Sequence, residues 1–198
     1  MCNAYEIGGK QGSFEGRVKA GALKALEEME KRLIRRTDRA PVILQDGELV
    51  EMRWGFERAG LGVINNSRSD KLDGRMWRDA FAERRCLIPM SGFYEWSGPK
   101  GKKQTHRLTS RSGKLLWVAG IWEESGELGH CFSMITTEAN KWMEPIHHRM
   151  PAILEGEERG DFLAGGLREF APGEEVLQVE DAANPLVKKK GWEQGELF

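Results

Sequence analysis

Two stretches of the chain carry apolar residues at helical spacing. In residues 17–36, positions such as Leu26 and Leu33 recur on one face with charged residues between them, which predicts one long amphipathic helix that ends before Pro41. A similar pattern predicts a second helix over residues 73–85. We also expect short helical pieces at residues 139–143, after a Thr-Thr-Glu cap, and 161–163.

Strand patterns fill most of the remaining chain. Two apolar runs flank Asp46-Gly47, a dipeptide typical of tight hairpin turns, and this predicts a hairpin over residues 42–54. The polar segment 98–104 is expected to be an exposed hairpin loop. Further strands are predicted at residues 86–89, 92–96, 105–108, 115–122 and 131–136.

These elements predict an α+β fold built on a curved, barrel-like antiparallel sheet with flanking helices, because strand pairs occur without regular βαβ alternation. The length of 198 residues suits one domain, which we place at residues 1–187. The Lys-rich segment 188–198 is expected to be a flexible tail.

The overall charge gives no support for nucleic-acid binding. The chain has 30 Lys and Arg residues against 31 Asp and Glu residues, for a formal net charge of −1. A DNA-binding surface must therefore come from a local concentration of basic residues. Hydrophobic residues make up 39% of the chain, an ordinary share for a globular protein.

The three cysteines, Cys2, Cys86 and Cys131, are far apart in the chain and odd in number. This argues against a disulfide framework and favours a reducing compartment. The chain shows neither an apolar run long enough to span a membrane nor a secretory signal. We expect a cytoplasmic protein, without membrane contact, metal or cofactor, and a monomer.

Cys2 is the first candidate for chemistry. Removal of Met1 would leave its amine and thiol on adjacent carbons, with reference pKa values of about 8 and about 8.5. Such an aminothiol can condense with an aldehyde, first as a Schiff base and then as a five-membered thiazolidine ring. The alternative is that Cys2 is an incidental residue at the start of a strand.

Glu95 and His147 are candidates for proton transfer. Strand alternation places Glu95 on the same face as Phe93, and a carboxyl group on a buried face has its charged form disfavoured, as in many general acids. His147, in a His-His-Arg-Met-Pro run, could shuttle protons. The alternatives are a solvent-facing Glu at a strand end and a polar loop. No spacing of Cys and His in the chain supports a zinc site.

Polar and aromatic residues offer candidates for DNA contact. Asn65 and Asn66 begin a polar cluster that ends in Arg68, and Arg side chains can fork onto phosphate. Tryptophans could stack on bases, although most of them must be core residues. For the arginines, the alternative is a set of solvated surface positions.

Together these segments resemble one family, the SRAP domain (SOS-response-associated peptidase), in family order over residues 1–154. Each segment is weakly specific, but the ordered set is strongly so. The matching segments are Met1-Cys2, Arg53-Trp54-Gly55, Asn66-Ser67-Arg68, Arg84-Arg85-Cys86-Leu87-Ile88-Pro89, Gly92-Phe93-Tyr94-Glu95-Trp96, Ala119-Gly120-Ile121-Trp122, Thr136-Thr137-Glu138-Ala139-Asn140 and Ile146-His147-His148-Arg149-Met150-Pro151.

The resemblance implies that the protein shields abasic sites in single-stranded DNA by a thiazolidine cross-link, as part of the DNA damage response. It implies Cys2 as the nucleophile, Asn66 as the residue that orients the amine or the sugar, Glu95 as the proton donor, and His147 as an aid to ring opening and proton transfer. It also implies phosphate contacts from Arg68 and Arg149, and aromatic contacts to DNA from Trp54 and Trp96.

This chain departs from the family pattern near the nucleophile. Asn3 and Ala4 replace a Gly-Arg pair that is common there, so a basic contact to DNA is missing. The connection between Gly55 and Asn66 lacks a usual Pro-Ser-Trp type segment, and His148 stands where Asp is frequent. These differences bear on DNA affinity and rate more than on the type of reaction.

Three functions follow as hypotheses. The first is covalent capture of abasic sites, with weak strand-cleaving lyase activity if the reaction stops at the Schiff base. The second is a cysteine peptidase with a Cys2–His147 dyad that removes its own Met1. The third is a single-stranded DNA or partner-binding module without a covalent step.

Overall fold

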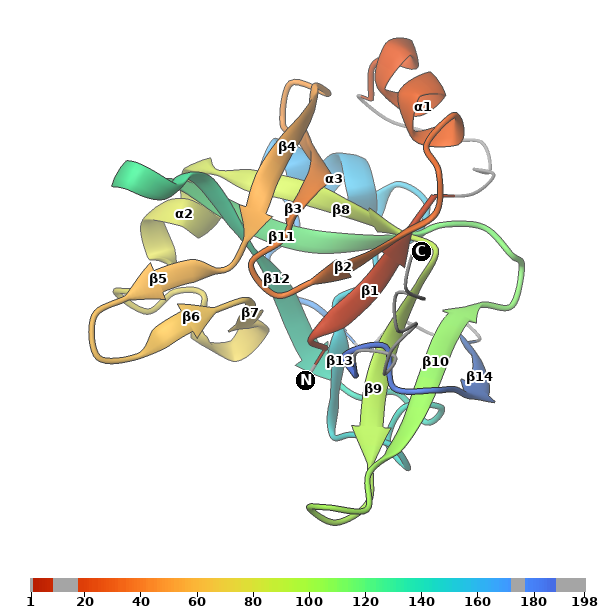
Figure 1. Cartoon of the computed structure of the whole chain (residues 1–198). Coiled ribbons are helices and arrows are strands. Elements are labelled where there is room, and N and C mark those ends of the chain that lie inside the picture. Colours follow the sequence, from red (N-terminus) through yellow and green to blue (C-terminus); the bar gives the residue numbers. More distant parts are fainter. Residues whose placement is uncertain (1, 9–17, 172–176, 188–198) are drawn as a thin grey trace, which may run out of the picture.

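The computed structural model describes residues 2–8, 18–171 and 177–187. Five strands of the larger sheet form a closed ring in the order β11-β8-β3-β4-β12, because β11 also pairs with β12. β7 and β13 extend this sheet along β12, so it has seven strands in all (Figure 1). The bounds are β3 Arg39–Leu44, β4 Leu49–Trp54, β7 Asn66–Arg68, β8 Arg85–Met90, β11 Leu116–Ser125, β12 Gly129–Glu138 and β13 Arg149–Pro151.

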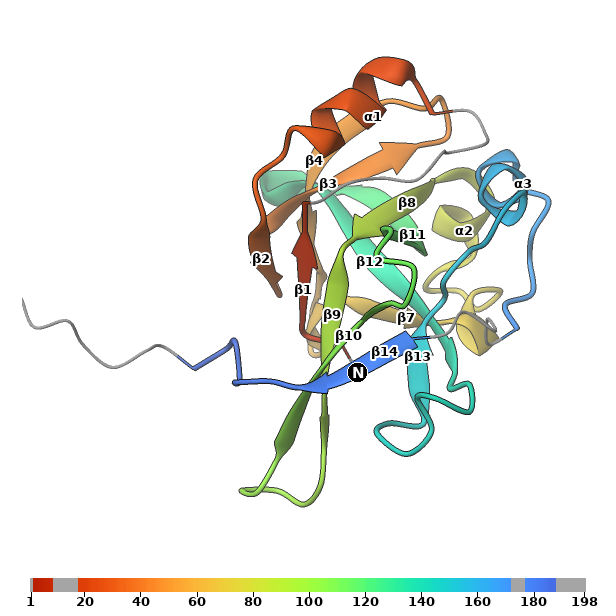
Figure 2. The same cartoon turned by 90° about the vertical axis from the view of Figure 1, so that its right-hand side faces the viewer.

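A second sheet of five antiparallel strands lies beside the ring in the order β14-β10-β9-β1-β2. Only Ser91 separates β8 of the ring from β9 of this sheet, so one nearly continuous stretch of chain belongs to both (Figure 2). The bounds are β1 Ala4–Ile7, β2 Arg32–Arg35, β9 Gly92–Ser97, β10 Gln104–Ser110 and β14 Leu177–Asp181.

Short helices and a small hairpin complete the described fold. The hairpin pairs β5 with β6 and leads directly to β7. The bounds are α1 Ala20–Glu27, α2 Arg78–Glu83, α3 Glu158–Ala164, β5 Phe56–Arg58, β6 Gly62–Ile64, and single 3-10 turns at Ser69–Lys71 and Gly126–Leu128.

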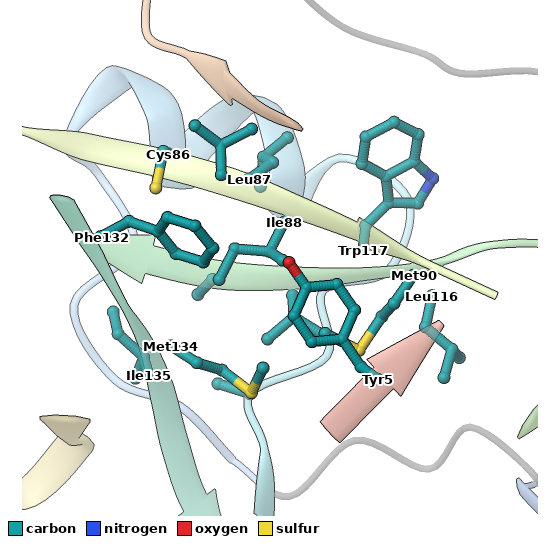
Figure 3. Close-up of a cluster of buried hydrophobic side chains, with 14 of the residues drawn as sticks. Tyr5, Cys86, Leu87, Ile88, Met90, Leu116, Trp117, Phe132, Met134 and Ile135 are labelled. Carbon is teal, nitrogen blue, oxygen red and sulfur yellow. The ribbon is translucent and has the colours of Figure 1, made fainter. Parts of the chain in front are cut away.

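The core fills the ring and the space between the two sheets. Figure 3 shows Tyr5 of β1 among side chains of β8, β11 and β12, so the strand that follows Cys2 is packed into the main core. Tyr5, Ile88, Phe132 and Met134 are all 0% exposed. Burying each such side chain contributes roughly 1.5–3 kcal/mol, which fixes β1 firmly in place.

The structure confirms the α+β class and the barrel-like sheet. It also confirms the hairpin at Asp46-Gly47, now β3 and β4, and the loop at 98–104 that joins β9 to β10. The sheet is not wholly antiparallel, because β12 runs parallel to β4 and β7. The predicted helical piece at 161–163 lies within α3.

The single long helix predicted for residues 17–36 is wrong. α1 ends at Glu27, and residues 32–35 form β2, which pairs with β1. Leu33 and Ile34 are adjacent apolar residues that suit either period. Ile34 is 1% exposed opposite Tyr5, so pairing with β1 buries it and overrides helix propensity.

The other helix predictions need shorter bounds or fail. α2 covers only Arg78–Glu83, since Gly74 weakens the preceding turn and Arg85 already belongs to β8. Residues 139–143 form loop and turns rather than a helix, and the predicted cap residues Thr136 and Thr137 lie in β12.

The flexible tail predicted for residues 188–198 lies outside the described residues, and the single domain over 1–187 stays a prediction. Within the described segments, every helix is too short or too polar to cross a membrane.

Candidate active site

Cys2 lies two residues before the start of β1, the strand that pairs with β2 on one side and with β9 on the other. Its residue is 1% exposed, and its thiol donates to the backbone oxygen of Ala4 at 3.3 Å. The strand that follows is held by Tyr5 and Ile7, both 0% exposed. Cys2 is therefore a buried thiol on a fixed strand end, not a loosely held chain end.

Two amide side chains hold the backbone of Cys2. Asn66 Nδ2 donates to the Cys2 carbonyl oxygen at 2.8 Å, and Asn65 Nδ2 donates to the same oxygen at 3.2 Å. Asn65 also reaches Asn3 Oδ1 at 3.4 Å. Asn65 lies between β6 and β7, and Asn66 is the first residue of β7. β7 pairs with β12, where Asn66 lies opposite Met134.

The side-chain oxygen of Asn66 is a hydrogen-bond acceptor that has no partner among the described residues. This Oδ1 atom is also shielded from solvent. A buried carbonyl without a partner costs about 1–3 kcal/mol, so a group that donates to it gains correspondingly. Asn66 can therefore orient a donor beside Cys2.

Glu95 places a carboxyl group beside the thiol. β9 pairs with β1 through Phe93 and Tyr5, and Glu95 is only 3% exposed. Burial, and next the negative charge of Glu95, raise the pKa of the Cys2 thiol to about 12. The thiol is therefore neutral at physiological pH, and the Glu95 carboxyl group is close enough to act on it electrostatically.

His147 lies on the loop before β13 and is partly buried. Its Nδ1 is 3.0 Å from both the backbone nitrogen and the backbone oxygen of Arg149, and its ring stacks on His148 at 4.4 Å between centroids. Burial lowers the pKa of His147, while the charge of Glu95 acts in the opposite direction. The neutral imidazole is therefore favoured near pH 7.

The four residues predicted to carry the chemistry are thus gathered from four parts of the chain. A hydrogen bond joins Asn66 to Cys2, and the charge of Glu95 acts on both Cys2 and His147. The group brings together a thiol, an amide and a carboxyl group on three buried residues, and an imidazole on a partly buried one. Electrostatic effects are stronger there than in water.

The two predicted phosphate contacts lie together beside this group. Arg68 is half-exposed and forms a bidentate ion pair with Asp70 at 2.8 and 2.9 Å. Arg149 is 7% exposed, and its guanidinium donates to the backbone oxygen and hydroxyl of Thr136. Both arginines line two adjoining hollows of about 380 and 350 Å³, one of which also includes His148.

The expectation that Trp54 stacks on DNA is wrong. Its side chain is 0% exposed, packs edge-on against Tyr5 at 5.0 Å, and donates its indole N–H to the Asn65 oxygen at 2.8 Å. Trp54 supports the site from inside the core. Trp96 is only partly buried, on β9 next to Glu95, so its contact with DNA stays a prediction.

Sequence reasoning misses the role of Asn65. The Asn65-Asn66 doublet is visible in the sequence, but only the family resemblance singles out Asn66. The structure shows that Asn65 contacts Cys2, Asn3 and Trp54. Across the described segments, no three His, Cys, Asp or Glu side chains cluster as metal ligands.

The chain matches the family model described as SOS response associated peptidase (SRAP) over residues 1–186. It is 34% identical over 138 residues to the abasic site processing protein YoqW of Bacillus subtilis, covering 61% of each chain. It is 32% identical over 143 residues to the abasic site processing protein HMCES of Xenopus tropicalis, covering 56% of this chain and 43% of that protein. The matched region thus spans about half the length of these relatives.

Solved structures share the fold at lower sequence identity. A crystal structure from Bordetella bronchiseptica has a TM-score of 0.72 and 20% identity, covering 92% of this chain and 100% of that chain. One from Bacteroides thetaiotaomicron has a TM-score of 0.69 and 21% identity, covering 91% and 92%. Because the family model matches nearly the whole sequence, this chain belongs to the SRAP family.

Proposed function

We propose that this protein processes abasic sites in DNA by forming a covalent thiazolidine cross-link through Cys2 after Met1 is removed. The observation that carries the proposal is the buried group around Cys2, in which Asn66 holds the backbone and Glu95 lies beside the thiol. The names of the relatives, abasic site processing proteins, support the choice of substrate. Single-stranded DNA is the proposed form of that substrate.

The reaction begins at the freed amine of Cys2. The amine attacks C1′ of the open-chain deoxyribose aldehyde, and loss of water gives a Schiff base. The thiol then adds across the C=N bond: sulfur bonds to C1′, and its proton ends on nitrogen. The sum is aminothiol plus aldehyde giving thiazolidine plus water, with no oxidant or reductant required.

Each neighbour of Cys2 has a defined task in this scheme. Glu95 transfers protons to the departing hydroxyl and from the neutral thiol, and His147 in its neutral form assists sugar-ring opening. Asn66 offers its unpartnered Oδ1 to the amine, as the described residues leave that oxygen without a donor. Arg68 and Arg149 contact the flanking phosphates, and Trp96 stacks on a neighbouring base.

The test is a denaturing gel with Met1-processed protein and single-stranded DNA that holds one abasic site. We expect a slow-migrating adduct that Cys2→Ala does not form. Cys2→Ser is the matched control of nearly the same shape. Both variants keep the amine, so borohydride reduction should trap their Schiff bases, but both lack the thiol that gives a stable product without reduction. Equal unreduced adduct from Cys2→Ala and the parent protein would refute the proposal.

A peptidase acting through a Cys2–His147 dyad is less well supported. A thiolate nucleophile needs a lowered thiol pKa, whereas burial and Glu95 raise the pKa of Cys2 to about 12. Intact-mass measurement of Met1 retention in Cys2→Ala separates self-processing from removal by an aminopeptidase.

A purely non-covalent DNA-binding module predicts equal affinity for intact and abasic DNA. Lyase activity, the monomeric state and a cytoplasmic, nucleoid-associated location stay predictions.

A further inference from the structure

Another hollow lies at the end of β1 opposite Cys2. It has a volume of about 390 Å³ and forms where β1, β9 and β10 meet the turn that links β10 to β11. Four basic side chains line it, and no acidic residue is among its described lining residues. The basic residues are Lys31, Arg107, Arg111 and Lys114.

These cations differ in how far carboxylates neutralise them. Lys31, Arg111 and Lys114 are exposed, and within the described segments none of them forms an ion pair. Arg107 differs, because it is bound to Glu6 at 2.7 Å and to Glu180 at 3.2 Å. The hollow therefore carries a local positive charge in a chain whose formal net charge is −1.

Hydroxyl groups and a fixed turn accompany the cations. The Ser110 and Ser112 hydroxyls lie 2.7 Å apart, and the Gly113 N–H donates to the Ser110 backbone oxygen at 3.0 Å, in a left-handed conformation with φ of 71°. The hydrogen bond fixes the backbone of the turn that carries Arg111 and Lys114. At the floor, the Ser91 hydroxyl is shielded from solvent and has no hydrogen-bond partner in the described part of the chain.

We propose that this hollow, here called the basic groove, binds a phosphate group. Clustered Lys and Arg charges with hydroxyl donors are the side chains that recognise phosphate oxygens, and a fixed turn reduces the entropic cost of binding. The Ser91 hydroxyl has no partner among the described residues and can donate a hydrogen bond to a phosphate oxygen. A free phosphate and a DNA backbone share this chemistry.

The DNA backbone is the source that the fold favours, and this part of the inference rests on the proposed function. Cys2 and Gly8 stand six residues apart, which at about 3.3 Å per residue separates the two sites by roughly 20 Å. A strand that keeps the stacked spacing of B-DNA, about 3.4 Å per nucleotide, would cover that span in about six nucleotides, and a more extended single strand would need fewer. Only an oligonucleotide with a long flank would then reach the basic groove.

The first experiment uses inorganic phosphate and no DNA. Amide chemical shifts of the full chain are followed during a phosphate titration, for the parent protein and for Arg111→Gln/Lys114→Gln. Lys24→Gln/Arg78→Gln removes the same charge from exposed positions on α1 and α2 and serves as the control. We expect shifts at Gly8, Ser91 and Gly113 in the parent and control, and at least about fivefold weaker binding in the groove variant. Equal titration of all three proteins would overturn the proposal.

The second experiment compares abasic oligonucleotides whose flanks have about two or about ten nucleotides. We expect the groove variant to bind the long oligonucleotide several-fold more weakly and the short one normally. The slope of log affinity against log salt should become shallower by about 0.7 for each phosphate that the variant no longer neutralises. Weaker phosphate binding without a length effect would support the groove with a free phosphate as its ligand. Adduct formation on the short oligonucleotide reports on the Cys2 reaction separately.

Discussion

The two ends of β1 present opposite kinds of surface. At the first end, Cys2 is 1% exposed and Glu95 is 3% exposed. The side-chain amides of Asn65 and Asn66 donate hydrogen bonds to the backbone oxygen of Cys2. At the other end, the basic groove is lined by exposed cations of which Lys31, Arg111 and Lys114 form no ion pair with described residues. One short strand therefore connects a buried site to a solvent-exposed one.

If both proposals hold, this difference explains how a chain with almost no net charge combines covalent chemistry with recognition of an anion. Proton transfer needs groups whose pKa values are set by burial and by each other. Attraction of phosphate needs exposed cations, whose effect is strongest before they are neutralised and weakens as salt is added. Variants at each end should therefore affect different measurements.

The largest expected effect concerns the reactivity of the Cys2 thiol in the chain that retains Met1. Burial and the charge of Glu95 raise its pKa from 9.0 to about 12. Near pH 8 this leaves about 10³-fold less thiolate than in the unfolded chain. Iodoacetamide labelling, located by peptide mass, should therefore be slow in the native protein and fast in urea. Equal labelling rates would show that the Cys2 thiol is not protected by burial in the native protein.

The same shift has a consequence for stability at alkaline pH. Because the native thiol keeps its proton when the unfolded thiol has lost it, the contribution of Cys2 to stability is complete below pH 9.0 and is lost as pH rises toward 12. Cys2→Ala should lose less stability over that range than the parent chain.

The next largest effect is expected from Glu95→Gln. General acid–base catalysis typically contributes about 10²-fold or more, so adduct formation should slow by about that factor. Non-covalent DNA affinity should change little, since the amide keeps the shape of the side chain. Glu180→Gln makes the same substitution near the other end of β1 and should leave the rate on a short oligonucleotide unchanged. A comparable loss of rate in both variants would show that the reaction does not depend specifically on the Cys2 end of β1.

The barrel and the central hairpin could be predicted from the sequence, because alternation and turn residues are local signals. The ordered motifs also point to Cys2, Glu95 and His147, whose part in a reaction stays a prediction. β2 could not be predicted, since Leu33 and Ile34 suit a helix or a strand and only pairing with β1 decides between them. The error at Trp54 has a related cause. An isolated Trp in a sequence can be a stacking surface or a core residue, and the partner of its N–H, Asn65, is set by tertiary structure.

The basic groove has no signal in the sequence. Its cations lie beside β2, on β10 and in the turn that follows β10, and each of them looks like an ordinary surface residue in the sequence. Their convergence depends on the order β14-β10-β9-β1-β2, which no local pattern encodes. The same applies to Asn65, whose contacts with Cys2 and Asn3 join segments more than sixty residues apart.

A smaller effect is expected from Asn66→Ala. The variant loses a 2.8 Å hydrogen bond to the Cys2 oxygen and leaves only the longer bond from Asn65. One net hydrogen bond of about 1 kcal/mol corresponds to a rate about fivefold slower if the bond positions the amine. Single-turnover adduct kinetics measure this, and Asn65→Ala should have a weaker effect. Normal rates in both would show that burial alone positions Cys2.

The smallest effect tests the connection between the two ends. Glu6 on β1 accepts hydrogen bonds from Arg107 at 2.7 Å and from Tyr94 at 2.5 Å. Burial raises the pKa of Glu6, but the bonds from Arg107 and Tyr94 outweigh it, so the pKa lies below its usual value of 4.5. Its ionised form therefore stabilises the fold above pH 4.5, and this contribution is lost as pH falls through the lowered value.

Glu6→Gln should accordingly flatten the acid side of the stability profile, because the variant has no carboxyl group to protonate. Urea unfolding at neutral and at acidic pH measures the difference, with Glu180→Gln as the exposed control from the same ion-pair group. Because the variant also releases the charge of Arg107 into the basic groove, phosphate binding should tighten slightly while adduct formation on a short oligonucleotide stays unchanged. A slower adduct with unchanged phosphate binding would instead mean that Glu6 serves the Cys2 end, and that β1 does not separate the two sites.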